Sequence, residues 1–328
     1  MEPGPVYVGG LERSGTSLIY ALLASHPGLA MTRRTNLWTH FYGQYGDLSD
    51  DENFERCFDM MMRYRRLVVL DLDADRLRAD FLAGERTYGR LFDLLERQCA
   101  EQLEKPRWGD KSLNTERYAD AIFEAFPAAR IIHMVRDPRD RYASSKTRWK
   151  RRRGGMGAGV AEWLDSVALA DRNRARYPDG YMVLRYEFLA SEPEAAVREV
   201  CGFIGEEYAP EMLEMRGAEK FREQGSNSSY GSREAGVIST DSIGRYRDVL
   251  APSDVAFVER VAGREMMKLG YVADGAVLAG GHRARFLIMD LPLDTMRLML
   301  WRASNAYKNW RGRPLPAYRI VSPGVSNQ

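Results

Sequence analysis

The chain has 328 residues, with 48 Lys and Arg against 46 Asp and Glu, so its formal net charge is +2; 45% of the residues are hydrophobic and 29% are charged. This composition supports a sizeable core and excludes a disordered, collagen-like or coiled-coil chain. It also disfavours a dedicated nucleic-acid binder, whose domain is usually strongly basic. No stretch has the length of an apolar membrane span and residues 1–10 lack the features of a signal peptide, so we expect a cytoplasmic protein.

The first predicted elements are a strand at residues 5–8, a glycine-containing loop and a helix at residues 16–25. A near-continuous apolar run at residues 129–135 predicts a buried parallel strand, with a helix after Pro138, and residues 181–184 predict a third strand. Helical patterns fall at residues 88–103, 116–126, 160–177, 195–204 and 254–269. Strands that alternate with helices predict an α/β protein, with a P-loop-like three-layer α/β/α fold around a central parallel sheet.

Three stretches are predicted to be loops because they are rich in Gly, Ser, Asn or Arg: residues 151–159, 225–242 and 274–281. The last one divides a main domain, residues 1–282, from a C-terminal helical extension, residues 283–328. Within the extension, residues 293–310 form an amphipathic pattern with Leu293, Met296, Leu300 and Trp301 on one side. We expect this side to pack on the main domain or on a partner subunit, in preference to a membrane surface.

The loop from Gly10 to Ser17 (GLERSGTS) lies between the first strand and the first helix, where backbone N–H groups and the helix dipole can bind phosphate. Thr16 stands where the Walker motif of an NTPase has its phosphate-binding lysine, which disfavours ATP. Arg13 supplies a cation earlier in the loop, and Ser14, Thr16 and Ser17 add hydroxyl donors around Gly15. The alternative is a turn that only caps the helix.

A second candidate phosphate site follows the strand at residues 129–135. It starts at Arg136 and has the sequence RDPRDRYASS (residues 136–145). The carboxyl ends of parallel strands share one edge of the sheet, so Arg136 and Arg13 are expected at the same edge. A guanidinium from the strand end and the hydroxyl of Ser144, two turns into the following helix, can hold a separate phosphate.

With these motifs in this order, the chain resembles the sulfotransferases that use 3′-phosphoadenosine 5′-phosphosulfate (PAPS), and in particular their tyrosylprotein and bacterial branch. In that family an R-S-G-T-[TS] loop binds the 5′-phosphosulfate, and an R-[DN]-P-[RK] stretch with a later serine binds the 3′-phosphate. The resemblance covers most of residues 5–271 and includes His26-Pro27, Asp110-Lys111, Phe126-Pro127, Arg185-Tyr186-Glu187, Ile238-Ser239-Thr240 and Gly244-Arg245-Tyr246-Arg247.

The resemblance implies that Lys111 contacts the transferring sulfonate, that Tyr186 lines the nucleotide pocket, and that Ser239 and Arg245 close over the nucleotide. The implied reaction moves a sulfonate from PAPS to a hydroxyl of a small-molecule, lipid or carbohydrate acceptor and leaves adenosine 3′,5′-bisphosphate. Arg13 and Lys111 would stabilise the charge that develops in the transition state, and no metal is expected.

The sequence departs from this branch where the catalytic base is usually found. The glutamate that takes the acceptor proton is replaced by Arg34, in the segment Met31-Thr32-Arg33-Arg34-Thr35-Asn36. An arginine stays protonated and cannot act as a base. His40 is the first substitute because histidine titrates near neutrality, ahead of Asp110 and Glu12. Alternatively, Arg33 and Arg34 bind an anionic acceptor.

Two other functions remain compatible with the motifs. A P-loop nucleotide kinase would require ATP and Mg²⁺, and the missing Walker lysine speaks against it. A non-catalytic nucleotide-binding protein is compatible with Arg34 at the position of the base. The sequence identifies neither the acceptor nor the oligomeric state.

Overall fold

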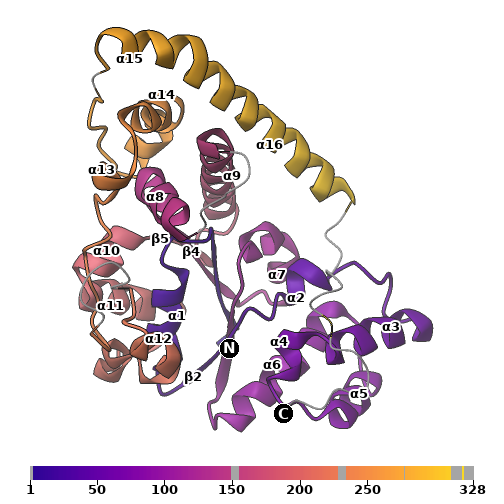
Figure 1. Cartoon of the computed structure of the whole chain (residues 1–328). Helices are drawn as coiled ribbons and strands as arrows, with labels where there is room; N and C mark the ends of the chain where they lie inside the picture. The colour runs from indigo at the N-terminus through magenta and orange to yellow at the C-terminus, as the bar shows by residue number, and fades with distance from the viewer. Residues whose placement is uncertain (1–2, 149–154, 228–233, 277, 312–319, 321–328) are drawn as a thin grey trace.

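A computed structural model describes residues 3–148, 155–227, 234–276, 278–311 and 320. A central sheet is covered by helices on both faces, and further helices are stacked beyond its carboxyl edge (Figure 1). The predicted three-layer α/β/α fold with a parallel sheet is confirmed.

The sheet consists of five parallel strands in the order β2-β3-β1-β4-β5. Their bounds are β1 Val6–Gly10, β2 Leu29–Arg33, β3 Arg107–Lys111, β4 Arg130–Val135 and β5 Tyr181–Arg185. In this register Val8 is paired with Lys111 on one side and with Ile132 on the other. The loop after β1, the last residue of β3 and the residue after β4 therefore meet at one edge of the sheet.

The sequence patterns found β1, β4 and β5 but missed β2 and β3. All five residues of β3 are buried although three of them are charged. Arg107, at its start, donates to the carbonyls of Gly4 and Ile204 and pairs with Glu206 at 2.8 Å. These partners satisfy the buried charge, so a strand with little apolar character is stable in the middle of the sheet.

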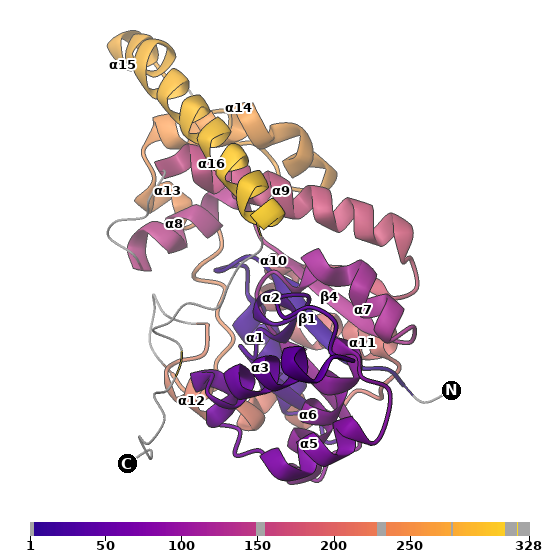
Figure 2. The same cartoon turned by 90° about the vertical axis from the view of Figure 1, so that its right-hand side faces the viewer.

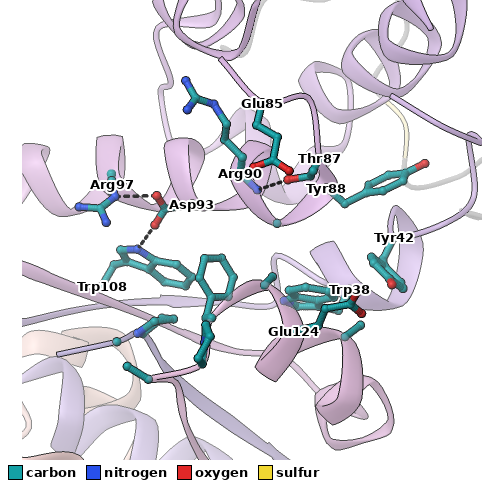
Figure 3. Close-up of a pocket in the computed structure, with 18 of the residues that line it drawn as sticks. Trp38, Tyr42, Glu85, Thr87, Tyr88, Arg90, Asp93, Arg97, Trp108 and Glu124 are labelled. Atoms are coloured by element: carbon teal, nitrogen blue, oxygen red, sulfur yellow. Dashed lines mark hydrogen bonds and ion pairs between the residues drawn. The ribbon is translucent and has the colours of Figure 1, made fainter. Parts of the chain in front are cut away.

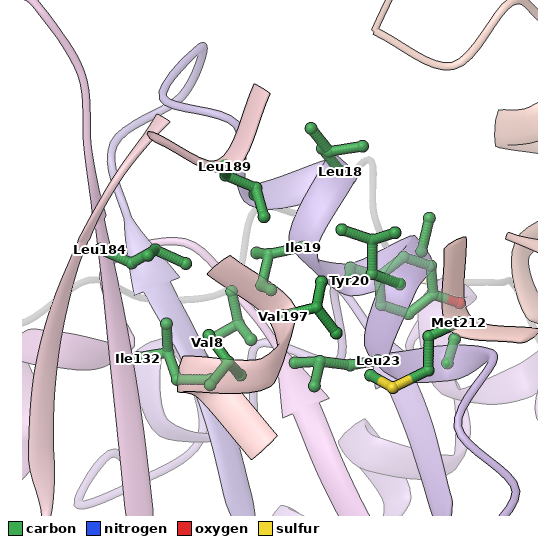
Figure 4. Packing of buried hydrophobic residues seen from close by; sticks show 14 of the residues in the cluster. Val8, Leu18, Ile19, Tyr20, Leu23, Ile132, Leu184, Leu189, Val197 and Met212 are labelled. Carbon is green, nitrogen blue, oxygen red and sulfur yellow. The ribbon is translucent and has the colours of Figure 1, made fainter. Parts of the chain in front are cut away.

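One face of the sheet packs on helix α1 (Thr16–Ala24) and on the helices that follow β5. Val8, Ile132 and Leu184 from three strands contact this layer (Figure 4). Lys105 donates to three carbonyls between Ala24 and Leu29 and so fixes the end of α1. The other elements of this layer are α10 Tyr186–Ser191, α11 Pro193–Ile204, η2 Pro210–Glu214, η3 Arg216–Ala218 and α12 Glu219–Glu223.

The other face turns the alternate strand residues, including Tyr7, Ala30 and Ile131, towards an aromatic-rich lobe. The lobe comprises α2 Leu37–His40, α3 Asp51–Met62, α4 Arg65–Val68, α5 Ala74–Leu82, α6 Tyr88–Gln102, η1 Thr115–Tyr118 and α7 Ala119–Ala125. The same face also carries the buried His133, whose ring nitrogens pair with the hydroxyls of Tyr181 and Ser166. His133 is therefore a core residue whose hydrogen-bonding groups are satisfied.

The remaining helices pack together over a third apolar cluster. They are α8 Pro138–Arg148, α9 Gly155–Arg176, α13 Tyr246–Val249, α14 Pro252–Lys268, α15 Gly280–Arg285, the π-helical turn η4 Phe286–Asp290 and α16 Leu291–Arg311. Figure 2 shows α16 crossing α9 near the start of α9, where Gly157 meets Asp294. None of the described helices combines the length and hydropathy needed to cross a bilayer.

The expected loop at residues 151–159 is wrong in part, and most of the named residues of the C-terminal helix do not pack on the main domain. Residues 155–159 of the predicted loop at 151–159 are the first turn of α9, and residues 151–154 lie outside the described part. The helix at residues 293–310 is present, but Leu293, Met296 and Leu300 point away from the main domain while Trp301 is half-buried. The residues that pack inward are Asp294 and Leu298, because close contacts with Gly157 set the rotation of the helix.

Candidate active site

The loop between β1 and α1 adopts the backbone that the phosphate-site prediction requires. Gly10, Arg13 and Gly15 all have positive φ, at 112°, 69° and 90°. Gly15 is the N-cap residue of α1 and provides no side-chain cap, so the N-terminal amides of α1 are not occupied by a capping group. A Cβ on Gly15 would collide with the ring of Tyr186, so the loop and this ring are in contact.

Arg136, directly after β4, lies against the same loop. Its guanidinium donates to the carbonyls of Arg13 at 3.1 Å and Ser242 at 2.5 Å, and lies 4.4 Å from the ring centroid of Tyr186. Among the described residues, its buried Nε has no hydrogen-bond partner. A buried donor of this kind fits an anionic ligand.

The two predicted phosphate sites touch each other directly. The Nε of Arg13 donates to the hydroxyl of Ser144 at 2.8 Å, which joins the first loop to the helix after the second one. A pocket of about 100 Å³ is lined by residues of both motifs, but Ser144, which is buried, is not among them. Its lining includes six residues singled out in the sequence: Arg13, Gly15, Thr16, Ser17, Arg136 and Tyr186. Ser14 is buried beside this pocket and does not line it.

The neighbouring arginines of the second motif have other partners. Arg139 pairs with Asp137 and Glu259, and Arg141 pairs with Glu162 and the carbonyl of Glu12. Both are buried. Of the arginines in this motif, Arg136 is thus the one whose side chain reaches the pocket.

A segment that includes Ser239 and Arg245 closes the pocket. Ser242 hydrogen-bonds with the hydroxyl of Tyr186 at 2.6 Å, and Asn227 donates to that hydroxyl and to the carbonyl of Ser239. The carboxylate of Asp140 accepts from the amides of Gly244 and Tyr246, which ties the segment to α8. Ser239 and Arg245 therefore flank the pocket without being among its lining residues.

Sequence reasoning missed Ser242 and Asn227, which line the pocket with Phe221 and Ser226. Ser242 lies between the two quoted motifs Ile238-Ser239-Thr240 and Gly244-Arg245-Tyr246-Arg247. A serine between two motifs that were assigned to the closing segment is a signal that was available. Asn227, in a stretch rich in Ser and Gly, carried none.

Lys111 is the last residue of β3, next to β1, and its side chain is buried. Its carbonyl accepts from the amide of Arg34 at 2.8 Å, so the segment after β2 runs beside it. Burial and the positive charges of Arg34 and Arg33 lower the pKa of Lys111 to about 8. Burial and the neighbouring cations therefore make Lys111 lose its proton at a lower pH than an ordinary lysine.

Arg34 has a φ of 63°, and its conformation is fixed by the side chain of Asn36. The Nδ2 of Asn36 donates to the carbonyl of Arg34 at 2.7 Å and to the hydroxyl of Tyr64 at 2.8 Å. Desolvation and the cations Arg33 and Arg66 lower the pKa of the Arg34 guanidinium. The position at which the resemblance expects a base is therefore occupied by an arginine with further cations around it.

The histidine proposed as a substitute base lies close to this segment. The ring of His40, at the end of α2, meets the ring of Tyr64 edge-on, with 6.1 Å between the centroids. Tyr64 also forms an antiparallel bridge with Ile320, so part of the C-terminal extension returns to this side of the molecule.

The second substitute, Asp110, is only 2% exposed and lies against another carboxylate, Glu96. The hydroxyl of Thr32 lies 3.1 Å from Asp110 and 3.0 Å from Glu96. Burial raises the pKa of Asp110 to about 6. A carboxylate enclosed in this way cannot touch an acceptor, so its position argues against a role as the base. Glu12, the third substitute, is exposed on the phosphate loop.

A larger cavity lies elsewhere. It has a volume of about 1150 Å³ and is lined by residues that precede the strands, such as Pro5, Pro106 and Ala128, so it opens at the amino edge of the sheet. Figure 3 shows its aromatic side chains, including Trp38, Tyr88 and Trp108, together with the ion pair between Arg97 and Asp93. The candidate active site is thus the smaller pocket at the opposite edge.

Comparison with solved structures gives several similar folds. The sulfotransferase domain of the Synechococcus olefin synthase is 20% identical, with 95% of each chain covered and a TM-score of 0.46. A sulfotransferase from Mycobacterium avium is 16% identical, with 83% of this chain and 78% of that chain covered and a TM-score of 0.46. A sulfotransferase from Alicyclobacillus acidocaldarius is 15% identical, with 82% and 96% covered and a TM-score of 0.40.

No curated protein sequence matches the chain significantly. The profile of the sulfotransferase family, by contrast, matches residues 5–210, which are more than half of the chain and include the phosphate loop, Lys111, Arg136 and Ser144. The chain therefore belongs to the sulfotransferase family and is an enzyme of sulfonate transfer.

Proposed function

We propose that the donor is PAPS and that its two phosphate groups bind in and beside the pocket at the start of α1. The hydrogen bond of 2.8 Å between Arg13 and Ser144 supports this proposal, because it brings the two predicted phosphate-binding segments into contact, and Arg13 and Arg136 both line the pocket. The loop amides, Thr16 and Ser17 would hold the 5′-phosphosulfate at the start of α1. Arg136 and Ser144 would hold the 3′-phosphate.

The fit of this ligand rests on the side chains around the pocket. Arg136 already donates to two carbonyls and has a buried Nε that awaits an acceptor. The ring of Tyr186 stacks on its guanidinium and provides an apolar wall. Ser14, Gly15, Ser239 and Arg245 would complete the binding residues from the loop and from the closing segment. The pocket must widen when a nucleotide enters, since its volume of about 100 Å³ is below that of usual ligand sites.

When bound, PAPS supplies an activated sulfonate and a phosphate leaving group. Arg13, from the loop, would stabilise the negative charge that develops on the leaving oxygen. Lys111 lies one strand away and would donate from its Nζ to the group in transfer. With a pKa of about 8, Lys111 carries its proton at neutral pH and loses it at mildly alkaline pH. No step in this scheme requires a metal.

The acceptor would be a hydroxyl of a small molecule, lipid or carbohydrate that approaches past Arg33, Arg34 and His40. His40 would take its proton. The cations around Arg34 would favour an acceptor that also carries a phosphate, carboxylate or sulfate, because an anion is stabilised by the same charges that lower the pKa of Lys111. In this proposal residues 1–282 are the transferase domain and residues 283–328 are an extension.

The test is incubation with sulfur-labelled PAPS, EDTA and an extract of candidate acceptors, followed by mass spectrometry of the sulfated products. Labelled product with PAPS, and no phosphorylated product with ATP and Mg²⁺, is the expected result. The Lys268→Ala variant, which removes an exposed lysine far from the pocket, serves as the control for Lys111→Ala. Tight binding of adenosine 3′,5′-bisphosphate without any sulfated product would favour the non-catalytic alternative.

A further inference from the structure

The C-terminal helices expose many large apolar side chains. Of the 14 large hydrophobic side chains that are exposed in the described part of the chain, eight lie between residues 287 and 307. We call this surface the outer face, and it comprises Leu287, Ile288, Met289, Leu293, Met296, Met299, Leu300 and Tyr307. Ile288 is 76% exposed, Met289 62% and Leu300 60%. Scattered apolar residues are normal on a protein surface, but a cluster of this size marks an interaction site.

The outer face is set by the way α16 packs. Its inner side places Leu298 and Asp294 against α9, where the Asp294 carboxylate accepts from the amide of Gly157 at 3.2 Å. Asp294 also pairs with Arg297 at 3.0 Å. A Cβ on Gly157 would collide with the backbone of Asp294, so the two helices touch through a glycine. Rotation of α16 would break these contacts, and the apolar residues on its other side stay exposed.

Positive charges flank this surface. Residues 280–308 contain five Lys and Arg against two Asp, a net charge of +3 in a chain whose total is +2. Both aspartates are neutralised within the segment, since Asp290 pairs with Arg285 and Asp294 with Arg297. Arg283, Arg302 and Lys308 are exposed and therefore accessible to a partner.

We propose that the outer face docks on an anionic lipid surface, with α16 lying parallel to the membrane plane. Apolar side chains along one side of a helix and cations on its flanks are the two features that hold an amphipathic helix at a lipid interface. The apolar groups enter the acyl boundary, while the long Arg and Lys side chains reach the lipid phosphates.

A second copy of the chain is the other candidate to cover this surface. Two copies related by a twofold axis would bring the same cationic flanks together, and the flanks have no unpaired acidic residue among the described residues to compensate them. Charge complementarity therefore favours the anionic surface. This inference concerns a face away from the donor pocket and stands without the proposed function.

The experiment is flotation of the purified full-length chain with two kinds of vesicles. One contains phosphatidylcholine alone and the other contains about 30% phosphatidylglycerol in phosphatidylcholine. We expect binding to the anionic vesicles and at least tenfold weaker binding to the neutral ones, because each basic side chain near an anionic surface contributes roughly 1 kcal/mol to the binding free energy. Binding to the anionic vesicles should decrease at high salt.

The double variant Met296→Glu, Leu300→Glu should abolish binding to the anionic vesicles. Its control is Val69→Glu, Met267→Glu, which adds the same charge at two residues of similar exposure, 69% and 67%, outside the outer face. Arg302→Gln, Lys308→Gln should keep the apolar surface but lose most of the preference for anionic vesicles. Thermal unfolding of each variant shows whether the fold is intact.

Three results would overturn the proposal. The wild-type chain fails to bind either kind of vesicle, or the outer-face double variant binds as well as its control. In the third, sedimentation shows a wild-type dimer that the outer-face variant alone converts to a monomer, which would assign the face to a second copy. None of these measurements involves PAPS or turnover. They can therefore contradict the lipid-docking proposal without bearing on the proposed transferase function.

Discussion

The two sides of the candidate site, which we propose bind the donor and the acceptor, differ in how far the protein satisfies its own polar groups. On the donor side Arg13 is bound to Ser144, and Arg136 is bound to the closing segment through Ser242. On the acceptor side Arg33 and Arg34 are exposed, and among the described residues neither forms an ion pair with a carboxylate. Their positive charges instead lower the pKa of Lys111. A network of side chains that is already hydrogen-bonded in the free protein favours one particular ligand, because little ordering is needed on binding. Exposed charges without such partners allow a few side chains to determine which substrate binds.

The difference also explains where the sequence departs from its family. The donor residues contact one another across three segments of the chain, so a substitution at one position disturbs the others. Arg34 is held mainly through its backbone, because its amide donates a hydrogen bond to the carbonyl of Lys111 and its carbonyl accepts one from the side chain of Asn36. Its side chain can change without breaking these contacts, and the acceptor side can therefore change its chemistry while the donor pocket stays intact.

The largest expected effect is that of Lys111→Ala, which removes the cation at the junction of the two sides. We expect kcat to fall by two to three orders of magnitude (about 100- to 1000-fold), as for the loss of a group that stabilises the transition state, with little change in the affinity for adenosine 3′,5′-bisphosphate. Steady-state kinetics and calorimetric titration check this, with Lys268→Ala as control. An unchanged kcat with a raised KM for the donor would make Lys111 a binding residue.

His40→Asn should lower the rate about 100-fold and remove the acid limb of the pH–rate profile, since histidine must lose its proton to act as a base. His282→Asn, on the exposed helix α15, is the control. Nucleotide binding should stay as in the wild type. A full acid limb in His40→Asn would exclude His40 as the base.

Lys111 itself should produce an alkaline limb. Its pKa in the folded protein is about 8, lower than usual, so the protonated form decreases as the pH rises through 8, and kcat should fall about tenfold per unit beyond it. Arg34→Glu replaces the nearest cation with an anion and should move this limb to higher pH. If the alkaline limb does not move in Arg34→Glu, the limb does not report the titration of Lys111.

Arg34→Glu should also raise the acceptor KM about tenfold or more if the natural acceptor is anionic, an effect that added salt reproduces in the wild type. Arg56→Glu, an exposed arginine on α3, is the matched control. Activity that appears instead towards a neutral alcohol would show that the glutamate can serve as the base of the related branch, and that Arg34 restricts the choice of substrate.

The smallest effect is expected for Ser144→Ala. It removes one hydroxyl from the 3′-phosphate site and from Arg13, which should weaken binding of adenosine 3′,5′-bisphosphate by roughly three- to tenfold. Ser145→Ala is a close control, because the hydroxyl of Ser145 is also buried but donates to the carbonyl of Arg141 within α8. Equal effects of the two changes would remove Ser144 from the binding residues.

The sequence was sufficient to predict the layers of the fold and most of the segments that line the small pocket at the carboxyl edge of the sheet. Short loops after apolar strands are local patterns, and the parallel topology brings them to one edge. The strand β3 was missed because its buried charges are satisfied by distant residues such as Glu206. Asn227 was missed because its hydrogen bonds join segments with no periodic pattern. The helix at residues 293–310 was predicted, but its rotation depends on the close contact with Gly157, which periodicity does not contain.

The central claim is that both phosphates of the donor bind in and beside one pocket. Calorimetric titration with adenosine 3′,5′-bisphosphate and with AMP, both in EDTA, tests it most directly on the wild type, on Arg136→Ala and on Arg130→Ala, which changes an arginine at the other end of β4. The account predicts that Arg136→Ala weakens binding of the bisphosphate about 10- to 100-fold and leaves AMP nearly unchanged, while Arg130→Ala affects neither. Equal weakening of both ligands by Arg136→Ala would contradict it.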